Sequence, residues 1–298
     1  MPDVVVVGAA TRDVDPDERR GWRPGGGVSY GALLLARVGL RVGAVVGLDR
    51  VAIEAGEPAA LHEAGVEVVP VELRHAPVFD NREAASGRRQ TCLDASDPMP
   101  ASATPREWRD ARTFLLAPVA GELGREWASV PDPHAVVALG WQGLLRRLVP
   151  GEEPVRLPPR AGPVEARADI AAISREDVPV ESAGDRLEAL LGRAGQSIAV
   201  TSGRSGGVYL WRTRAGDIAA HQWRAVPARR EVDPTGAGDV FLAALLAARL
   251  ILGDDPSRPG AALRFAAVAA SLSVEDVGLA AVPDLAQIRA RIRETQAR

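Results

Sequence analysis

Residues 231–241 read EVDPTGAGDVF, a glycine-rich turn that runs into an apolar stretch. A turn-forming Asp-Pro pair precedes three small residues, Gly236, Ala237 and Gly238, and Asp239 follows where the apolar run begins. Small residues open backbone angles that are closed to larger side chains, so successive amides can point to one side as an anion-binding nest. The positive end of a helix starting near Asp239 would reinforce this nest. A glycine turn followed by an acidic helix cap is the structural alternative.

Around this turn, short β-branched runs alternate with alanine- and leucine-rich stretches of helical length. The runs lack polar alternation, which is typical of strands covered on both faces in a parallel sheet. Strands are predicted at Val4–Val7, Val42–Val46, Val66–Val71, Thr113–Leu116, Ala135–Leu139, Ile170–Ile173, Ile198–Thr201 and Gly207–Trp211. Helices are predicted at Ser29–Val38, Glu54–Ala64, Leu187–Ala194, Asp239–Leu252, Ala261–Val274 and Leu285–Gln296. This order favours an α/β fold with a doubly wound, mostly parallel sheet flanked by helices.

Two segments interrupt the strand–helix order: residues 74–105 are polar, poor in aromatic residues and bracketed by prolines, and residues 150–165 are rich in proline. In the first, two extended pieces at Pro77–Asn81 and Arg88–Leu93 are predicted to form a hairpin that projects as a small β lid. We place this lid at about residues 74–95, with residues 14–24 as its candidate extension. The second segment, residues 150–165, holds five prolines and is predicted to be an exposed loop. Because strand–helix order resumes after both, we expect a single domain over the whole chain.

The composition excludes several classes of protein. A formal charge of −3 and a pI near 5.9, without a basic block, argue against nucleic-acid binding. No apolar run approaches the ~20 residues that span a bilayer, so we expect no membrane association. Cys92 is the one cysteine, which excludes an intramolecular disulfide and a cysteine metal cage. With no charged or apolar leader at the start, these features favour the cytoplasm.

The sequence contains no lysine, so all 36 side chains counted as Lys+Arg are arginine. This excludes a phosphate-loop lysine, Schiff-base chemistry and the lysine of protein kinases. Phosphate chemistry would take its positive field from helix-terminal amides, metal ions or arginines. The candidate arginines are Arg88, Arg89 and Arg204, although each is more typical of a solvated surface charge.

Two further glycine-rich stretches mark places where the backbone would approach a ligand closely. The first precedes an amphipathic helix and consists of Gly25, Gly26 and Gly27. A flexible loop is the alternative for this stretch. The second, VTSGRSGGVYLW (200–211), follows a strand and has Thr201, Gly203 and Gly206 at a spacing suited to nucleotide phosphates. A tight hairpin turn is the alternative there.

The chain thus has an early G-x-x-x-x-D strand, a helix led by paired glycines, a T-x-G-x-x-G turn and a late D-x-T-G-A-G-D-x-F motif. This order resembles the ribokinase-like (PfkB) carbohydrate kinases from Val4 to about Pro283. The resemblance implies a ribokinase-like fold and transfer of a phosphoryl group from ATP, with Mg²⁺, to a hydroxyl of a sugar, polyol or nucleoside. It also implies that K⁺ is a candidate cofactor.

The resemblance implies a role for each matching residue. Asp239 would be the catalytic base that takes the hydroxyl proton, and the anion hole would consist of Gly236, Ala237 and Gly238. The substrate would be bound by Asp13, Thr11, Gly25 and Gly26. The nucleotide would be bound by Thr201, Gly203 and Gly206. The backbone near Asp233 and Thr235 would form the K⁺ site.

The sequence departs from the family pattern at three places. Tyr30 stands where many sugar kinases have asparagine, and a phenol lacks the paired donor and acceptor of a carboxamide. We therefore expect Tyr30 to be a core or stacking residue. Residues 174–177 (SRED) replace the N-x-x-E motif that organises magnesium waters, and Asp177 keeps its charge. Only eleven residues separate Asp13 from Gly25, too few for the long lid hairpin of many relatives.

These departures favour the polyol- and inositol-kinase-like branches of the family. We predict an ATP-dependent kinase of a sugar or polyol that acts as a monomer or homodimer. A nucleoside kinase of the same fold, or a catalytically weak protein that senses a sugar or nucleotide, are the alternatives. A pure sensor has no need of a base, so the presence of Asp13 and Asp239 argues against it. A dinucleotide oxidoreductase is disfavoured because no G-x-G-x-x-G follows the first strand.

Overall fold

The computed structural model describes residues 1–84, 87–178, 187–188, 190–253 and 255–296. In this part of the chain the largest element is a nine-stranded sheet with the order β15-β14-β13-β12-β9-β8-β1-β4-β5. Its strands are β1 (Val4–Ala9), β4 (Val42–Asp49), β5 (Glu67–Leu73), β8 (Thr113–Leu116), β9 (Val136–Gly140), β12 (Ile170–Ser174), β13 (Ser197–Thr201), β14 (Gly207–Arg212) and β15 (Ile218–Trp223). Pairing is parallel from β5 to β13 and antiparallel at the β14–β15 edge. The predicted α/β fold with a mostly parallel sheet is confirmed.

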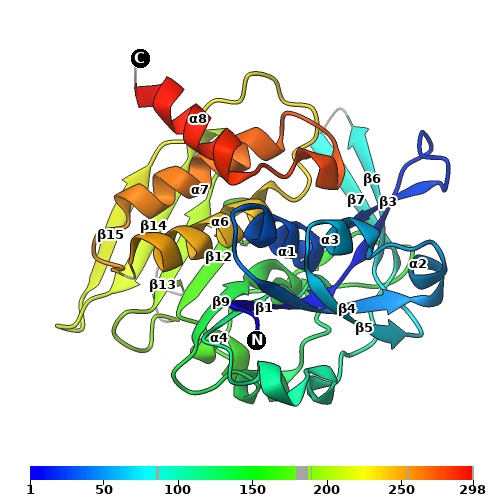
Figure 1. Cartoon of the computed structure of the whole chain (residues 1–298), viewed down its shortest axis with the longest axis horizontal. Coiled ribbons are helices and arrows are strands. Elements are labelled where there is room, and N and C mark those ends of the chain that lie inside the picture. The colour runs from blue at the N-terminus through cyan, green and yellow to red at the C-terminus, as the bar shows by residue number, and fades with distance from the viewer. Residues whose placement is uncertain (85–86, 179–186, 189, 254, 297–298) are drawn as a thin grey trace.

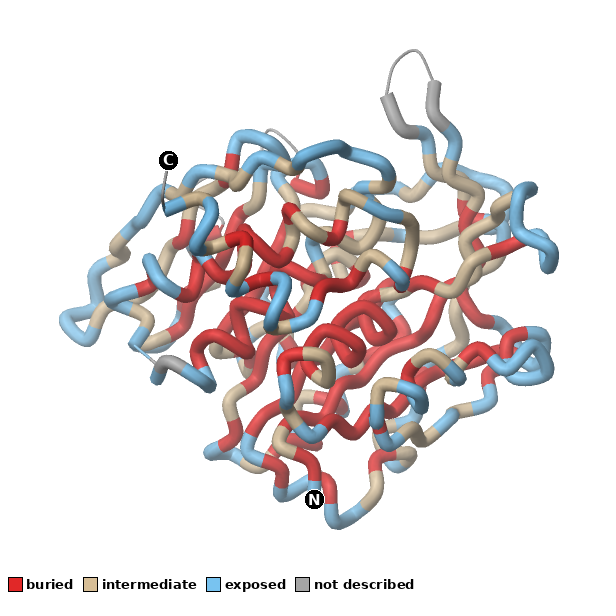
Figure 2. The backbone as a smooth tube through the Cα atoms, turned by 45° about the horizontal axis from the view of Figure 1, so that its top comes forward, coloured by how far each residue is buried: buried red, intermediate tan, exposed pale blue. Residues whose placement is uncertain are grey.

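Alternate residues of the central strand β1 pack into two separate cores. Val4 and Val6 join the core that contains buried residues of helices α1, α6 and α7, whereas Val5 and Val7 join the core on the other face. Successive side chains of a strand point to opposite faces, so a strand covered on both faces needs an unbroken apolar run. Figure 1 shows α1, α6 and α7 together on one face, and Figure 2 shows the buried segments enclosed by exposed loops.

The helices agree with the sequence-based expectation at four of the predicted positions. The described α-helices are α1 (Gly27–Arg37), α2 (Arg50–Glu54), α3 (Ala59–Glu63), α4 (Pro163–Arg167), α6 (Ala237–Leu252), α7 (Gly260–Ser273) and α8 (Leu285–Gln296). In that part of the chain no helix combines the length and apolar character required to cross a membrane.

Two predicted helices differ from the structure. The one expected at Glu54–Ala64 is wrong, because α2 ends at Glu54 and only the short helix α3 (Ala59–Glu63) lies within this stretch. Gly56 between them has a φ of 70°, and Pro58 forms the N-cap of α3. A glycine in the left-handed region ends a helix, and proline is tolerated only at a helix start. The helix expected at Leu187–Ala194 lies partly outside the described residues, and its last four residues are not helical.

A smaller sheet of four strands continues from β1. Its order is β3-β2-β6-β7, with β2 (Thr11–Val14), β3 (Trp22–Gly25), β6 (Val78–Ala84) and β7 (Gly87–Asp94). The predicted hairpin is therefore confirmed as β6 and β7, and β6 pairs with β2 in the small sheet (Figure 1). Only Ala10 separates β1 from β2, so the small sheet is attached directly to the centre of the large one.

The order of the large sheet reverses next to β1. β4 and β5 lie on one side of it, whereas β8 and the strands that follow lie on the other. In doubly wound sheets, ligands bind outside the carboxyl ends of the strands at such a switch point. The ends of β1 and β8 therefore mark where a site is expected. A short hairpin of β10 (Arg146–Arg147) and β11 (Val155–Arg156) lies partly in the predicted exposed loop.

Candidate active site

A large cleft opens at the carboxyl ends of the main strands. Its volume is ≈ 1460 Å³, and its walls are the segments after β1, β8, β9, β12 and β13, the start of α6, and strands β6 and β7. The predicted site residues line this cleft, with the exceptions of Gly25 and Asp233. Each exception contacts a lining residue, because Gly25 lies against Asp13 and Asp233 is hydrogen-bonded to Thr235. The fold thus brings the dispersed sequence motifs into one place.

The turn before α6 is held in shape by a glycine and a tyrosine. Gly236 is the N-cap of α6 and has a φ of 77°, in the left-handed region that favours glycine. A Cβ at this position would lie 2.5 Å from Cε1 and Cζ of Tyr30. Tyr30 is only 2% exposed, so its ring forms a rigid wall behind the turn. The core role expected for Tyr30 therefore includes support of the predicted anion hole.

Asp239 occupies the first turn of α6, where backbone N–H groups lack intrahelical partners. Burial raises the pKa of Asp239 from 3.8 to about 6. The guanidinium of Arg146 opposes this rise, whereas the carboxylates of Asp177 and Asp13 add to it. The side chain lines the cleft. Asp239 is thus a carboxylate with a raised proton affinity that faces the space where a ligand would bind.

We expect the kcat of a reaction that uses Asp239 as base to rise with pH through about 6 and then to level off, because only the ionised carboxylate accepts a proton. A pH–rate profile under saturating substrates measures this midpoint. Arg146→Gln removes the cation that opposes the pKa rise, so its midpoint should move to higher pH. A flat wild-type profile across this range would contradict the assignment.

The stretch Gly25–Gly27 lies between two carboxylates. A Cβ at Gly25 would lie 2.5 Å from Asp13 Oδ2, and one at Gly27 would lie 2.8 Å from Asp239 Oδ1. Gly26 has a φ of 89°, and its Cβ would lie 2.8 Å from the carbonyl oxygen of Ala9. A side chain at Gly25 or Gly27 would therefore displace the neighbouring carboxylate, and one at Gly26 would displace the end of β1. A close approach of backbone to Asp239 at Gly27 was not foreseen from the sequence.

A hydrogen-bonded chain of side chains runs from the small sheet through Arg146 of β10 to Asp177 in the turn after β12. Asn81 Nδ2 donates to Asp13 Oδ1 at 3.3 Å, and Gln90 Nε2 donates to Asn81 Oδ1 at 2.8 Å. Arg146 Nη1 then donates to Gln90 Oε1 at 3.1 Å, while its Nη2 donates to Asp177 Oδ1 at 2.9 Å. These contacts connect the two acidic ends of the site through neutral amides and one guanidinium.

Sequence reasoning missed three members of this chain: Asn81, Gln90 and Arg146. Asn81 and Gln90 are cross-strand partners in the β6–β7 hairpin, so their contact depends on its register. Their positions inside the two predicted extended pieces were the available signal. Arg146 begins β10, and nothing in its sequence surroundings distinguishes it from other arginines.

Glu122 is a further functional candidate that the sequence did not reveal. It is 1% exposed and accepts hydrogen bonds from the amides of Ala9, Val119 and Ala120 at 2.8 to 3.1 Å. Complete burial raises the pKa of Glu122, and the amides that donate to it counteract the rise. Its carboxylate joins the end of β1 to the loop after β8, and Val119 in that loop lines the cleft. Glu122 therefore holds the end of β1 and the loop after β8 in place beneath the cleft.

The end of the cleft beyond β13 is lined by small and apolar residues. Thr201, Gly203 and Gly206 lie here, as predicted from their spacing. The opposite wall is formed by Trp223, Ala225, Val226, Pro227, Ala228, Ala267, Ala270, Ser271 and Val274. Trp223 stacks on Phe241 of α6 with ring centroids 5.3 Å apart. Ser271 is 7% exposed, and its Oγ has no hydrogen-bond partner in the described part of the chain.

The predicted metal-binding residues have protein partners in the structure. Asp177 accepts hydrogen bonds from Gln142 at 3.0 Å and from Arg146, so both of its oxygens are engaged. Asp233 Oδ1 accepts hydrogen bonds from the amide and the hydroxyl of Thr235. Within the described ranges, no cluster of three or more His, Cys, Asp or Glu residues is arranged to hold a metal ion. Direct binding of a metal ion to Asp177 would therefore compete with Gln142 and Arg146 for the carboxylate.

The candidate arginines at the rim differ from Arg146. Arg89 pairs with Glu153, and Arg204 pairs with Glu231 at 2.7 Å. The Arg204 side chain is 84% exposed, as expected for a solvated charge. The side chain of Arg88 lies outside the described residues. Arg146, 12% exposed, is thus the more buried positive charge near Asp239.

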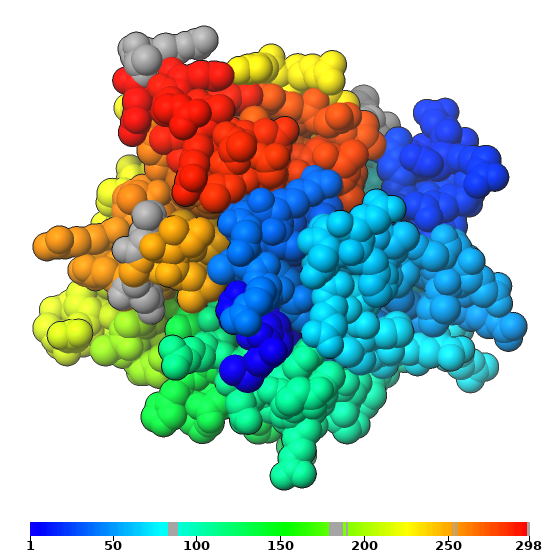
Figure 3. All heavy atoms as spheres, viewed as in Figure 1, coloured from blue at the N-terminus to red at the C-terminus, as the bar shows by residue number. Residues whose placement is uncertain are grey.

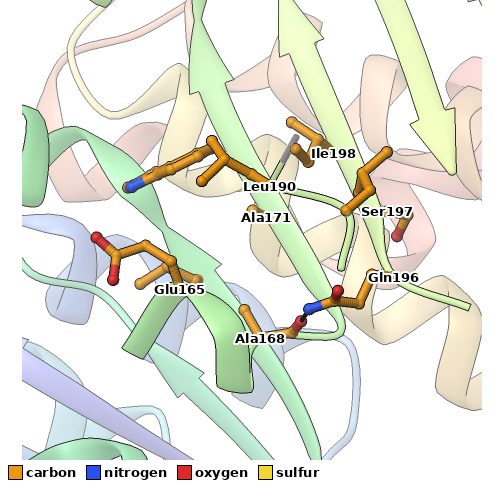
Figure 4. A pocket seen from close by; sticks show the side chains of 10 residues that line it. Glu165, Ala168, Ala171, Leu190, Gln196, Ser197 and Ile198 are labelled. Atoms are coloured by element: carbon orange, nitrogen blue, oxygen red, sulfur yellow. Dashed lines mark hydrogen bonds between the residues drawn. The ribbon is translucent and has the colours of Figure 1, made fainter. Parts of the chain in front are cut away.

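A second cavity, drawn in Figure 4, is too small for a substrate. Its volume is ≈ 10 Å³, about that of one water molecule. Figure 4 shows Gln196 bonded to the backbone of Ala168, and Nε2 of Gln196 donates to that carbonyl at 2.8 Å. The cavity lies behind β12 and β13, away from the carboxyl edge, and we assign no ligand to it.

The fold is shared with kinases of the ribokinase family. A pyrophosphate-dependent kinase of this family, complexed with a pyrophosphate analog and myo-inositol, is 20% identical, with a TM-score of 0.69 over 92% of this chain and 96% of that chain. Arabidopsis thaliana ribokinase, complexed with ribose and ATP, is 20% identical, with a TM-score of 0.70 over 98% and 99% of the two chains. A putative ribokinase II from E. coli, in complex with ATP and Mg²⁺, is 18% identical, with a TM-score of 0.71 over 99% and 100%.

Residues 166–285 match the model of the pfkB family carbohydrate kinases. No curated protein matches the chain in sequence. The matched segment contains the glycine turn after β13 and the start of α6, which form one half of the cleft. The predicted resemblance to this family is confirmed. The matches agree with the prediction of a sugar or polyol kinase.

Proposed function

We propose that the protein is an ATP-dependent kinase that phosphorylates a hydroxyl group of a neutral sugar or polyol. The observation that carries this proposal is the position of Asp239. Its carboxylate, with a pKa raised to about 6, lies at the start of α6 and faces a cleft that also contains Asp13. A base next to a helix N-terminus can accept a proton while the adjacent amides bind the anion that reacts.

In this mechanism the acceptor hydroxyl attacks the terminal phosphorus of the donor. The hydroxyl proton moves to Asp239 Oδ, the new O–P bond forms, and the bond to the bridging oxygen of the leaving ADP breaks. The amides of Gly236, Ala237 and Gly238 would stabilise the charge on the transferred group. Phosphoryl transfer depends mainly on positioning and charge neutralisation, so this chemistry does not need a lysine.

A bound Mg²⁺ would neutralise charge on the donor phosphates. Mg²⁺ typically takes one or two protein carboxylates together with substrate phosphates and keeps several waters. Asp177 fits this role through water, because it lines the cleft near Asp239 while its own oxygens are held by Gln142 and Arg146. Arg146 would add a fixed positive charge on the same side.

A neutral, polyhydroxylated acceptor suits the polar lining around Asp13. Carboxylate and amide groups from Asp13, Asn81 and Gln90 offer both donors and acceptors to hydroxyl groups. Arg89 and Arg146 each have an acid partner, which leaves little positive charge for a phosphorylated acceptor. The related structures contain ribose and myo-inositol, in support of this class of substrate.

We propose that the small sheet, with β6 and β7, acts as the lid.

The end of the cleft beyond β13 favours a nucleoside triphosphate over pyrophosphate as donor. Pyrophosphate has no apolar part, whereas the wall of small residues with Trp223 suits a flat base and its ribose. Ser271, buried and without a hydrogen-bond partner in the described residues, adds a polar group to this apolar wall. A base that supplied a partner would remove the cost of that unsatisfied hydroxyl.

The test is release of ADP or phosphate with a panel of polyols, sugars and nucleosides, each with ATP or pyrophosphate, in the presence of Mg²⁺. We expect turnover with ATP and a sugar or polyol. Ala270→Leu at the donor end should raise the KM for ATP about tenfold through steric conflict. Ala261→Leu, on the exposed side of the same helix, is the matched control and should leave this KM unchanged. Turnover of an acceptor with pyrophosphate but not with ATP would overturn the assignment of ATP as donor.

The same panel separates the kinase from the other functions considered. Preference for a nucleoside acceptor would identify a nucleoside kinase. Thermal stabilisation by a sugar or nucleotide without any product would identify a sensing protein and overturn the proposed activity.

A further inference from the structure

Arg23 connects the small sheet to the loop that precedes the anion-hole turn. It lies on β3 directly opposite Asp13 of β2 in the antiparallel ladder. Its guanidinium pairs with Asp15, lies 3.6 Å from Glu18 and places Nη1 3.9 Å from Asp233 Oδ2. In Figure 3 the dark-blue segment that includes the β2–β3 connection projects at the upper right. The Arg23 side chain is 29% exposed, so most of it is covered by the surrounding residues.

The carboxylate of Asp233 is already surrounded by donors from the protein. Oδ1 accepts from the Thr235 amide at 2.9 Å and from the Thr235 hydroxyl at 2.5 Å. Oδ2 accepts from the amide of Gly278 at 3.3 Å and faces Arg23. A carboxylate offers about four lone-pair directions, and these contacts use them. A metal ion bound to the Asp233 carboxylate would have to displace one of these donors.

A K⁺ ion in the expected backbone site near Asp233 and Thr235 would therefore find the neighbouring Asp233 carboxylate already engaged by protein donors and by Arg23. K⁺ bound to Asp233 would lie close to the Arg23 guanidinium, and two like charges at such a distance repel each other. We propose that the guanidinium of Arg23 provides, from within the chain, the positive charge that a monovalent cation would provide at Asp233. Turnover of the kinase proposed above then does not depend on K⁺.

This arrangement gives Arg23 a positioning role. Asp233 begins the D-x-T-G-A-G-D motif, and its amide bonds to the carbonyl of Val274 at the end of α7. Arg23 thus ties a strand of the small sheet to a loop only three residues before Gly236. Because Asp13 is the cross-strand partner of Arg23, the same strand pair also carries the carboxylate proposed to bind the acceptor.

The experiment compares kcat in KCl, NaCl and tetramethylammonium chloride at equal ionic strength, for wild type, Arg23→Gln and Arg23→Lys. We expect the same wild-type kcat in all three salts. Arg23→Gln should lose roughly tenfold in kcat without K⁺, as when one charged contact is removed. KCl should restore part of this loss, and Arg23→Lys should retain cation-independent turnover. Arg20→Gln is the matched control from the same segment, since Arg20 stacks on Trp22, and it should behave as wild type.

A second measurement does not depend on activity. Melting temperatures of wild type should be equal in the three salts, whereas Arg23→Gln should be stabilised specifically by K⁺. Rb⁺-soaked crystals should show an anomalous peak beside Asp233 in the variant and not in wild type. Activation or stabilisation of wild type by K⁺ overturns the proposal, and so does an Arg23→Gln variant that no cation affects. If no acceptor is phosphorylated, the proposed function fails while the melting and crystal data still decide the role of Arg23.

Discussion

Asp239→Asn is expected to lower the kcat for hydroxyl phosphorylation at least ~10²-fold, the low end for loss of a general base. Asparagine keeps the size of the side chain next to Gly27 but cannot accept the hydroxyl proton. The donor contacts proposed for Thr201 and Gly203 lie in another segment, so the Kd for ATP should stay unchanged. Steady-state ADP release and calorimetric titration with a non-hydrolysable ATP analogue measure the two quantities.

The control is Asp217→Asn, a change of the same kind at an exposed position between β14 and β15. It should retain wild-type kcat and Kd. Turnover near wild type in Asp239→Asn would exclude this carboxylate as the base. A parallel loss of ATP binding would instead indicate that the substitution had disturbed the turn as a whole.

The same variant has a predicted effect on stability. The pKa of Asp239 is raised in the folded protein from 3.8 to about 6, so the folded state holds this proton more tightly than the unfolded state. Its contribution to stability is complete below the unfolded pKa and is lost as pH rises through about 6. At pH 8, roughly two units above the folded pKa, Asp239→Asn should therefore melt at a higher temperature than wild type. The difference in melting temperature should vanish below the unfolded pKa of 3.8. Reduced activity with unchanged or increased stability would separate a chemical role from a folding defect.

Gly236→Ala is expected to lower kcat by ~10² to 10³, the loss typical of a damaged anion hole. Alanine at a φ of 77° is strained by about 1 kcal/mol or more. Its Cβ would also meet the Tyr30 ring at 2.5 Å, so the turn must move away from the amide positions that bind the transferred group. Turnover measured under saturating substrates, where binding effects are removed, reports this loss.

A second substitution separates the two causes. Tyr30→Ala combined with Gly236→Ala removes the steric conflict but keeps the strain, so partial recovery of kcat is expected relative to Gly236→Ala alone. Gly260→Ala at the start of α7 is the matched control, because no atom lies within 4 Å of its added Cβ. It should leave kcat and melting temperature unchanged. Full activity of Gly236→Ala would contradict an anion hole at this turn.

Much of the fold follows from local sequence signals. The valine run of β1 predicts a strand buried on both faces, and the regular return of such runs predicts the large sheet. The helix expected at Glu54–Ala64 failed because Gly56 and Pro58 outweigh its apolar periodicity. The edge strand Ile218–Trp223 was not predicted, since its polar positions lack the apolar run of the inner strands.

The candidate site was only partly predictable for a related reason. Asp239, Asp13 and the glycines belong to contiguous motifs whose backbone needs are visible in the chain itself. Arg146, Gln90 and Glu122 act through contacts between distant segments, which depend on strand register and on the packing of loops. A side chain whose partner is set by tertiary structure leaves no periodic or local signal.

The length of the stretch Gly25–Gly27 limits the distance between the two carboxylates that would contact the acceptor. Its first residue lies against Asp13 and its last against Asp239, and two peptide steps span at most about 7 Å. The separation of the two carboxylates is thus tied to the backbone rather than to flexible side chains. We expect the acceptor hydroxyls that bind Asp13 to determine which other hydroxyl of the acceptor reaches Asp239. Regioselectivity would then be a property of backbone length, and a single inserted residue in this stretch should change which position of the acceptor is phosphorylated.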